Sequence, residues 1–149
     1  MKRAASGALR VALACSVVTA PLSAAPSFVP TPPAQANYML NCMGCHLADG
    51  SGAQGKVPSL RDSLGVLSRS SAGRRYLVQV PGSAQSPLSN LELAQVLNWM
   101  VRNLAPRGAV DGFTEFTAVE VADYRRVTLV NVRDTRAQLL SSAATRAAR

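Results

Sequence analysis

The sequence predicts an all-α fold, a small helical domain followed by a short helical extension. Two segments carry the pattern of a capping box, Ser89-Asn90-Leu91-Glu92 and Thr117-Ala118-Val119-Glu120. Each box comes directly before apolar residues at helical spacing, which is the signature of a helix start. No stretch of any length shows the alternation of a half-buried strand. A chain of 149 residues with 48% hydrophobic residues fits one small domain.

Residues 1–36 are predicted to be a signal peptide and a proline-rich spacer. Three basic residues precede an apolar run over residues 11–20, which is too short to span a bilayer comfortably. Small residues form two cleavage sites, after about residue 25 or residue 36. Alternatives are an uncleaved anchor and, less well supported, a lipoprotein attached at Cys15. The signal predicts export to a bacterial periplasm and no membrane span after cleavage.

Residues 42–46 read Cys-Met-Gly-Cys-His, the pattern for covalent attachment of a c-type haem. The thiols of Cys42 and Cys45 can each form a thioether with one haem vinyl group, and His46 directly follows as the iron ligand. His46 is the chain's only histidine. A structural zinc site would need four ligands, and a thioredoxin-like pair would need a βαβ context that is not visible. We therefore predict one covalent haem c.

A loop follows the motif, with three glycines in the six residues 50–55. It leads to Pro58, whose segment is expected to be extended. A backbone carbonyl here can accept a hydrogen bond from the second ring nitrogen of His46 and fix its orientation. Pro58 is therefore a candidate cofactor-binding residue. The alternative is an ordinary loop proline.

The remaining helices are predicted from the spacing of apolar residues and from the glycines and prolines that mark turns. One helix is expected from near residue 34 into the motif, and two pieces cover residues 60–79 with a break at Gly73. A turn at Pro81-Gly82 and a polar loop over 83–87 precede the helix that Ser89 caps. Beyond Pro106, short helices are expected to about Arg126 and over 132–140, and the last nine residues are expected to fray.

These residues together resemble a class I (mitochondrial-type) c-type cytochrome. The resemblance covers roughly residues 34–104 and follows the family's order: Tyr38, the Cys-x-x-Cys-His motif, Ala48-Asp49-Gly50-x-Gly52, Val57-Pro58-Ser59-Leu60 and the Ser89-capped helix. It implies a cytochrome c domain over 37–106, with residues 107–149 as an extension. It also implies that the first and last helices of this domain cross beside the haem, with Tyr38 and Trp99 packed at the crossing.

The sequence departs from the family on the distal side of the haem, opposite His46. The family usually supplies a methionine before the last helix, but Ser86 or Val80-Pro81 stands there instead. Met43 lies inside the motif, Met39 lies one turn before it, and Met100 lies on a helix stripe where a core role is the simpler interpretation. Met100 is thus a weak candidate for the sixth ligand. The alternatives are water, Ser86, Gln85, or a ligand from another chain.

The predicted function is that of an exported monohaem cytochrome, an electron carrier between periplasmic redox partners and not an enzyme. One alternative is an open-site haem protein, a gas sensor or weak peroxidase, and another is the haem subunit of a periplasmic dehydrogenase complex. Part of the net charge of +8 belongs to the signal, and the arginine-rich tail either serves solubility or docks onto an acidic partner by complementary charge. Export and the absence of any binding motif disfavour nucleic acid.

Overall fold

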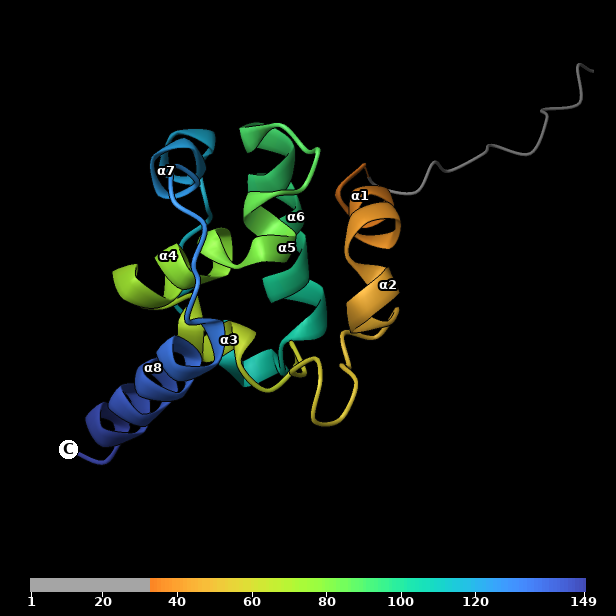
Figure 1. Ribbon diagram of the computed structural model, residues 1–149. Helices are drawn as coiled ribbons and strands as arrows, with labels where there is room; N and C mark the ends of the chain where they lie inside the picture. Colours follow the sequence, from red (N-terminus) through yellow and green to blue (C-terminus); the bar gives the residue numbers. More distant parts are fainter. Residues whose placement is uncertain (1–32) are drawn as a thin grey trace, which may run out of the picture. The chain divides into compact units, whose positions relative to one another are not determined.

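The computed structural model describes residues 33–149, which belong to one compact unit. Within this range the regular structure is helical, apart from one isolated bridge between Ala53 and Val57, so the predicted all-α class is confirmed. The elements are α1 (Pro33–Asn41), α2 (Met43–His46), α3 (Leu64–Leu67), α4 (Ser71–Gln79), α5 (Pro81–Ala84), α6 (Asn90–Leu104), the 3-10 turn η1 (Arg107–Ala109), α7 (Ala118–Tyr124) and α8 (Val132–Ala147) (Figure 1). The signal peptide predicted for residues 1–36 lies largely outside the described residues.

Helices α1 and α6 pack against each other. Tyr38 of α1 is fully buried, and its ring lies 5.1 Å from that of Trp99 on α6, as the resemblance implied. On the same helix, Leu93, Val96 and Val101 are at most 2% exposed. The apolar stripe predicted for this helix therefore forms one wall of the core.

The two predicted capping boxes differ in the structure. At α6 the box is complete, because the Ser89 hydroxyl accepts from the Glu92 N–H (3.2 Å) and the Glu92 carboxylate accepts from the Ser89 N–H (2.8 Å). At α7 the Thr117 hydroxyl accepts from the Glu120 N–H (3.1 Å), but the Glu120 carboxylate turns to Arg74. The second box is therefore half formed, because an ion pair competes for its acid.

The segment over residues 60–85 corrects three sequence predictions. The break between the two helical pieces lies at residues 68–70, and Gly73 lies inside α4. A Cβ at Gly73 would approach the Leu67 carbonyl oxygen to 2.1 Å, so this glycine permits close packing and does not end a helix. Pro81 begins the short helix α5, because proline is well tolerated in a first turn, and the predicted loop starts later.

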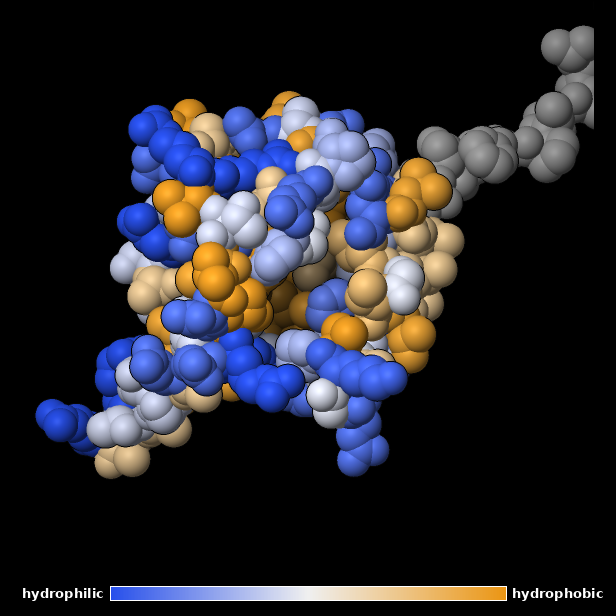
Figure 2. All heavy atoms as spheres, in the orientation of Figure 1, coloured by the Kyte–Doolittle hydropathy of each residue, from blue (hydrophilic) through white to orange (hydrophobic). Residues whose placement is uncertain are grey.

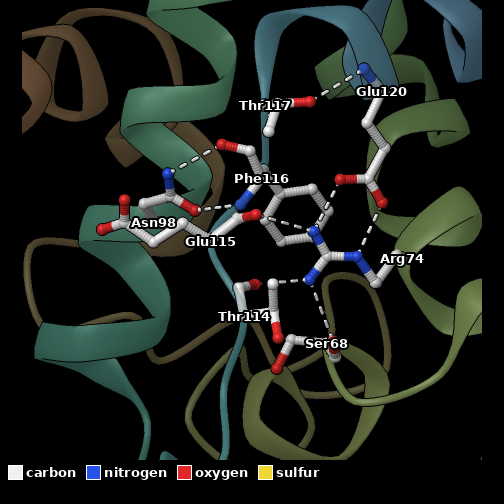
Figure 3. A network of polar contacts seen from close by, with 8 residues as sticks. All are labelled: Ser68, Arg74, Asn98, Thr114, Glu115, Phe116, Thr117 and Glu120. Carbon is white, nitrogen blue, oxygen red and sulfur yellow. Dashed lines mark hydrogen bonds and ion pairs between the residues drawn. The ribbon is translucent and has the colours of Figure 1, made fainter.

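Arg74 joins the C-terminal extension to the rest of the domain (Figure 3). Its guanidinium contacts both Glu120 carboxylate oxygens at 2.6 Å and stacks over the Phe116 ring, 3.9 Å from its centroid. It also donates to the carbonyls of Ser68 and Thr114. The extension thus shares the core of the domain.

Asn98 of α6 makes the second such connection, because its side-chain amide pairs with both backbone polar groups of Phe116, at 2.7 and 3.1 Å (Figure 3). Helix α8 is longer than predicted, since it continues through Ala147 where fraying was expected. None of its residues is fully buried.

Candidate functional site

One large cavity of about 470 Å³ opens between the motif and the C-terminal helices. Figure 2 shows it as a hollow with apolar residues at its centre and polar residues along its rim. Its apolar lining includes Leu60, Leu67, Leu77, Val80, Leu88, Leu93, Val96, Leu97, Met100 and Val132. A cavity of this size and lining suits a large apolar ligand.

All three chemically active residues of the motif line this cavity. Cys42, Cys45 and His46 meet there because Cys45 N–H and His46 N–H both bond to the Cys42 carbonyl, at 3.2 and 3.1 Å, in a helical turn. Both thiols are free, with Cys45 exposed and Cys42 half-buried. Burial raises the pKa of Cys42 to about 11, and the nearby Cys45 adds to the shift. The site thus presents a protonated thiol inside and a second thiol at the surface.

Tyr38 fixes the backbone that leaves the motif. Its hydroxyl donates to the Leu47 carbonyl at 2.6 Å and lies 3.3 Å from the His46 carbonyl. Leu47 has φ +51°, a conformation that is uncommon for a residue with a side chain. Burial raises the pKa of Tyr38 to about 12, so its hydroxyl stays a donor well into the alkaline range. The buried tyrosine therefore holds the chain where it turns away from His46.

The His46 imidazole lies at the cavity, next to the loop that carries Pro58. Burial lowers the pKa of His46, and the Pro58 backbone partly offsets this by raising the same pKa. Its Nδ1 atom is buried and has no hydrogen-bond partner of normal geometry within residues 33–149. Pro58 also lines the cavity, so the two residues predicted to act together lie together. The hydrogen bond itself remains a prediction.

The loop of residues 80–88, here the distal loop, is where the resemblance expects a sixth ligand. Ser83 and Ser86 from this loop line the cavity, whereas Gln85 does not. Of the three methionines in the described range, Met100 alone lines the cavity, and it is packed in the core with 6% exposure. Met39 is 47% exposed and lies outside the lining.

Arg125 of the C-terminal extension holds the distal loop. Its guanidinium donates to the Ala84 carbonyl (2.9 Å), the Leu88 carbonyl (2.6 Å) and the carbonyl of Ser86, and lies 3.1 Å from the Ser86 hydroxyl. These acceptors are 37–41 positions away in sequence. One side chain therefore satisfies three backbone carbonyls that would otherwise lack partners in the fold.

The extension also supplies two cavity residues that the sequence analysis missed, Val132 and Arg136 of α8. Phe116 and Val121 of the extension pack in the core and do not line the cavity. The spacing of Val132 and Arg136, four apart on a predicted helix, places them on one face. Only the tertiary fold shows which surface that face meets.

The lining fits a haem. Two thiols and one imidazole from a single Cys-x-x-Cys-His motif line an apolar cavity. A zinc site gains no support, since no cluster of three Cys, His, Asp or Glu side chains occurs in the described part of the chain. These features have the character of a protein that carries a covalent haem.

The chain is 30% identical to cytochrome c-552 of Thermus thermophilus, in an alignment over 108 residues that covers 60% of this chain and 82% of that protein. A second cytochrome c-552 of the same organism is also 30% identical over 108 residues, which cover 60% of this chain and 73% of that protein. No protein-family model matches the chain. The chain belongs to the c-type cytochromes.

Proposed function

We propose that the protein is an exported monohaem c-type cytochrome of class I that carries single electrons between redox partners. The observation that carries the proposal is the meeting of Cys42, Cys45 and His46 at one apolar cavity, in a chain that belongs to the c-type cytochromes. When bound, haem c supplies an iron that cycles between ferric and ferrous states. The protein holds, orients and shields this group.

Each cavity residue has a role under this proposal. Cys42 and Cys45 anchor the haem, His46 is the proximal iron ligand, and Pro58 orients the His46 ring. The leucines and valines of the cavity keep water out, which makes the charges that remain more effective at setting the potential. Cys45 is exposed, so one attachment point lies at the surface, where a redox partner can approach.

A second candidate function follows from the distal loop. Neither Ser83 nor Ser86 is a strong iron ligand, and Met100 is fixed in the core by its place on α6. A sixth position without methionine lowers the reduction potential or leaves the iron open to small ligands. The open-site alternative, a gas sensor or weak peroxidase, therefore stays beside electron transfer. The chain has no second histidine to act as a distal acid–base group.

The proposed location is the periplasm, and it rests on the N-terminal sequence. Among the described residues, no helix is long and apolar enough to cross a membrane. Later cleavage, after residue 36, would remove the first turn of α1, whereas cleavage after about residue 25 would leave α1 whole. The basic extension favours an acidic docking surface on the partner, which a periplasmic dehydrogenase complex could present.

The test is to express the full chain, signal included, in a bacterium that matures c-type cytochromes. Haem stain on a denaturing gel should follow the periplasmic protein. The absorption spectrum of the ferric and ferrous protein, with and without CO, then separates the two candidates. A low-spin spectrum that ignores CO supports plain electron transfer, and rapid CO binding supports an open site. A periplasmic protein without covalent haem would refute both.

A further inference from the structure

Helix α8 brings a guanidinium to the edge of the haem cavity. Arg136 lines the cavity together with Val132, one turn earlier, and Tyr76 of α4. Burial raises the pKa of Tyr76, and the positive charge of Arg136 opposes that rise, which agrees with a guanidinium close to the phenol. Arg136 is half-buried, in contrast to Arg133 on the same helix, which is exposed and does not line the cavity.

Among residues 33–149, no ion pair balances the charge of Arg136. The other well-packed arginines have partners: Arg74 pairs with Glu120, and Arg125 donates to three carbonyls. No hydrogen bond or ion pair between described residues involves Arg136. A partly desolvated charge without a partner is costly, so a binding partner for it is expected.

The charges around the cavity point to an acidic group on the ligand itself. The cavity lining contains no Asp or Glu, and apart from His46 its ionisable nitrogen groups are Lys56 and Arg136, both basic. A planar guanidinium binds a carboxylate through two parallel hydrogen bonds, which makes it well suited to an anionic group at a cavity edge. A ligand for this cavity is therefore expected to carry a carboxylate near α8.

We propose that Arg136 binds a propionate carboxylate of the haem. This inference rests on the proposed function. Haem carries its propionates on the edge opposite the vinyl groups that form thioethers, and α2 and α8 lie on opposite sides of the domain in Figure 1. With the thioether edge fixed at Cys42 and Cys45, the propionate edge faces the side from which Arg136 comes. The C-terminal extension then forms part of the haem site through a charge that the family's core pattern does not contain.

The experiment compares Arg136→Gln with Arg136→Lys and with Arg133→Gln, the control that removes the same charge from the exposed face of α8. Each variant is made as the full chain with its haem attached. The readouts are the equilibrium constant for reduction by a reference mediator and the propionate bending band in the resonance Raman spectrum. A cation near the haem favours the ferrous state, so Arg136→Gln should lower that constant by about threefold to tenfold.

The expected pattern is specific to the bound carboxylate. Arg136→Gln should change both the equilibrium constant for reduction and the propionate bending band. Arg136→Lys should keep most of the wild-type equilibrium constant but not the wild-type band. Arg133→Gln should change neither. Equal effects of Arg136→Gln and Arg133→Gln, with an unchanged band, would overturn the inference. The inference would also be overturned if added acetate, at fixed ionic strength, changed the equilibrium constant for reduction of the wild-type protein. Arg136 would then be free to bind an external carboxylate. Wild-type protein without covalent haem would overturn the proposed function as well.

Discussion

The two sides of the cavity are built in different ways. The side around His46 comes from one stretch of sequence, with Tyr38, the motif and Pro58 all within 21 consecutive residues. The distal loop depends instead on Arg125, which contacts it from 37–41 positions away. A local motif can therefore be recognised in the sequence alone, whereas the distal side is defined by long-range contacts of the C-terminal extension.

The difference also concerns how each side is stabilised. Near His46, short-range bonds dominate: Tyr38 bonds to Leu47, and a Cβ at Gly52 would lie 1.9 Å from the Val57 carbonyl oxygen, so that loop closes tightly. The distal loop itself contains no methionine. We infer that the Arg125 contacts keep the loop in place without a bond from such a residue to the iron. Five predictions test this comparison, from the largest expected effect to the smallest.

Replacing both motif thiols, Cys42→Ser with Cys45→Ser, removes the two attachment points on the proximal side. We expect complete loss of covalent haem, because serine forms no thioether. Haem stain on a denaturing gel measures this directly. The matched control is Cys15→Ser, which lies outside the described residues and should leave the haem attached. Haem that remains on the double variant after denaturation would refute the assignment.

Replacing Arg74 by Met tests how far the extension is part of the fold. The Arg74 and Glu120 side chains are 11% and 20% exposed, so the variant leaves a largely buried carboxylate without its partner. We expect a loss of about 3 kcal/mol in the free energy of unfolding, measured by urea denaturation. Arg102→Met breaks the exposed pair with Glu115 and should cost at most about 1 kcal/mol. Equal effects would mean that the extension is only loosely attached.

Arg125→Gln releases the distal loop. The carbonyls of Ala84, Ser86 and Leu88 lose their donor, and we expect a loss of about 2 kcal/mol in unfolding free energy because partly buried acceptors stay unpaired. The ferrous protein should bind CO faster than wild type. Arg126→Gln is the control, since Arg126 is exposed and its pair with Asp123 is long, at 3.9 Å. Unchanged CO kinetics in Arg125→Gln would show that the loop does not depend on this contact.

Ser89→Ala removes the N-cap of α6, and we expect a loss of about 1 kcal/mol in unfolding free energy. Hydrogen bonds from Ser89 lower the pKa of Glu92 below its ordinary value of 4.5. The folded state therefore gains stability from ionised Glu92 above that value, and loses it as the pH falls through the lowered pKa. The stability difference between wild type and Ser89→Ala should accordingly shrink in acid. Gln95→Ala, at an exposed position of α6, should show no such trend.

Met100→Leu should have the smallest effect. Met100 is 6% exposed on the buried face of α6, and leucine has similar volume, so we expect a destabilisation of less than about 1 kcal/mol. The ferric absorption spectrum should stay unchanged. Loss of a low-spin spectrum in this variant would contradict the core assignment and make Met100 the sixth ligand.

The sequence was sufficient to predict structure that depends on residues close together in the chain. The Ser89 box and the periodicity of α6 were predicted from local sequence, whereas the packing of Tyr38 against Trp99 was implied by the family resemblance. Gly73 was misjudged because a glycine that breaks a helix and one that admits a close backbone contact look the same in a sequence. The half-formed box at Thr117 was misjudged because the partner of Glu120 lies 46 positions away.

The same restriction to short-range sequence signals explains which residues of the cavity could be predicted. Cys42, Cys45, His46 and Pro58 could be predicted as haem-site residues because their chemistry is encoded in order and at short range, and the structure places all four at one cavity. Arg136 was not found, because a guanidinium on a polar helix looks like any solvated charge until the fold places it at a cavity. The contacts of Arg125 with the distal loop were equally invisible. Arg125 and Arg136 both belong to the C-terminal extension, so the long-range contributions to the cavity come from that part of the chain.

The most direct test of the account is the mass of the exported protein after full denaturation in acid. The account predicts a single species that carries the mass of one haem beyond the processed polypeptide, with the absorption of haem c retained. Haem that separates from the polypeptide on denaturation, or a polypeptide mass with no addition, would contradict covalent attachment at Cys42 and Cys45 and with it the proposed function.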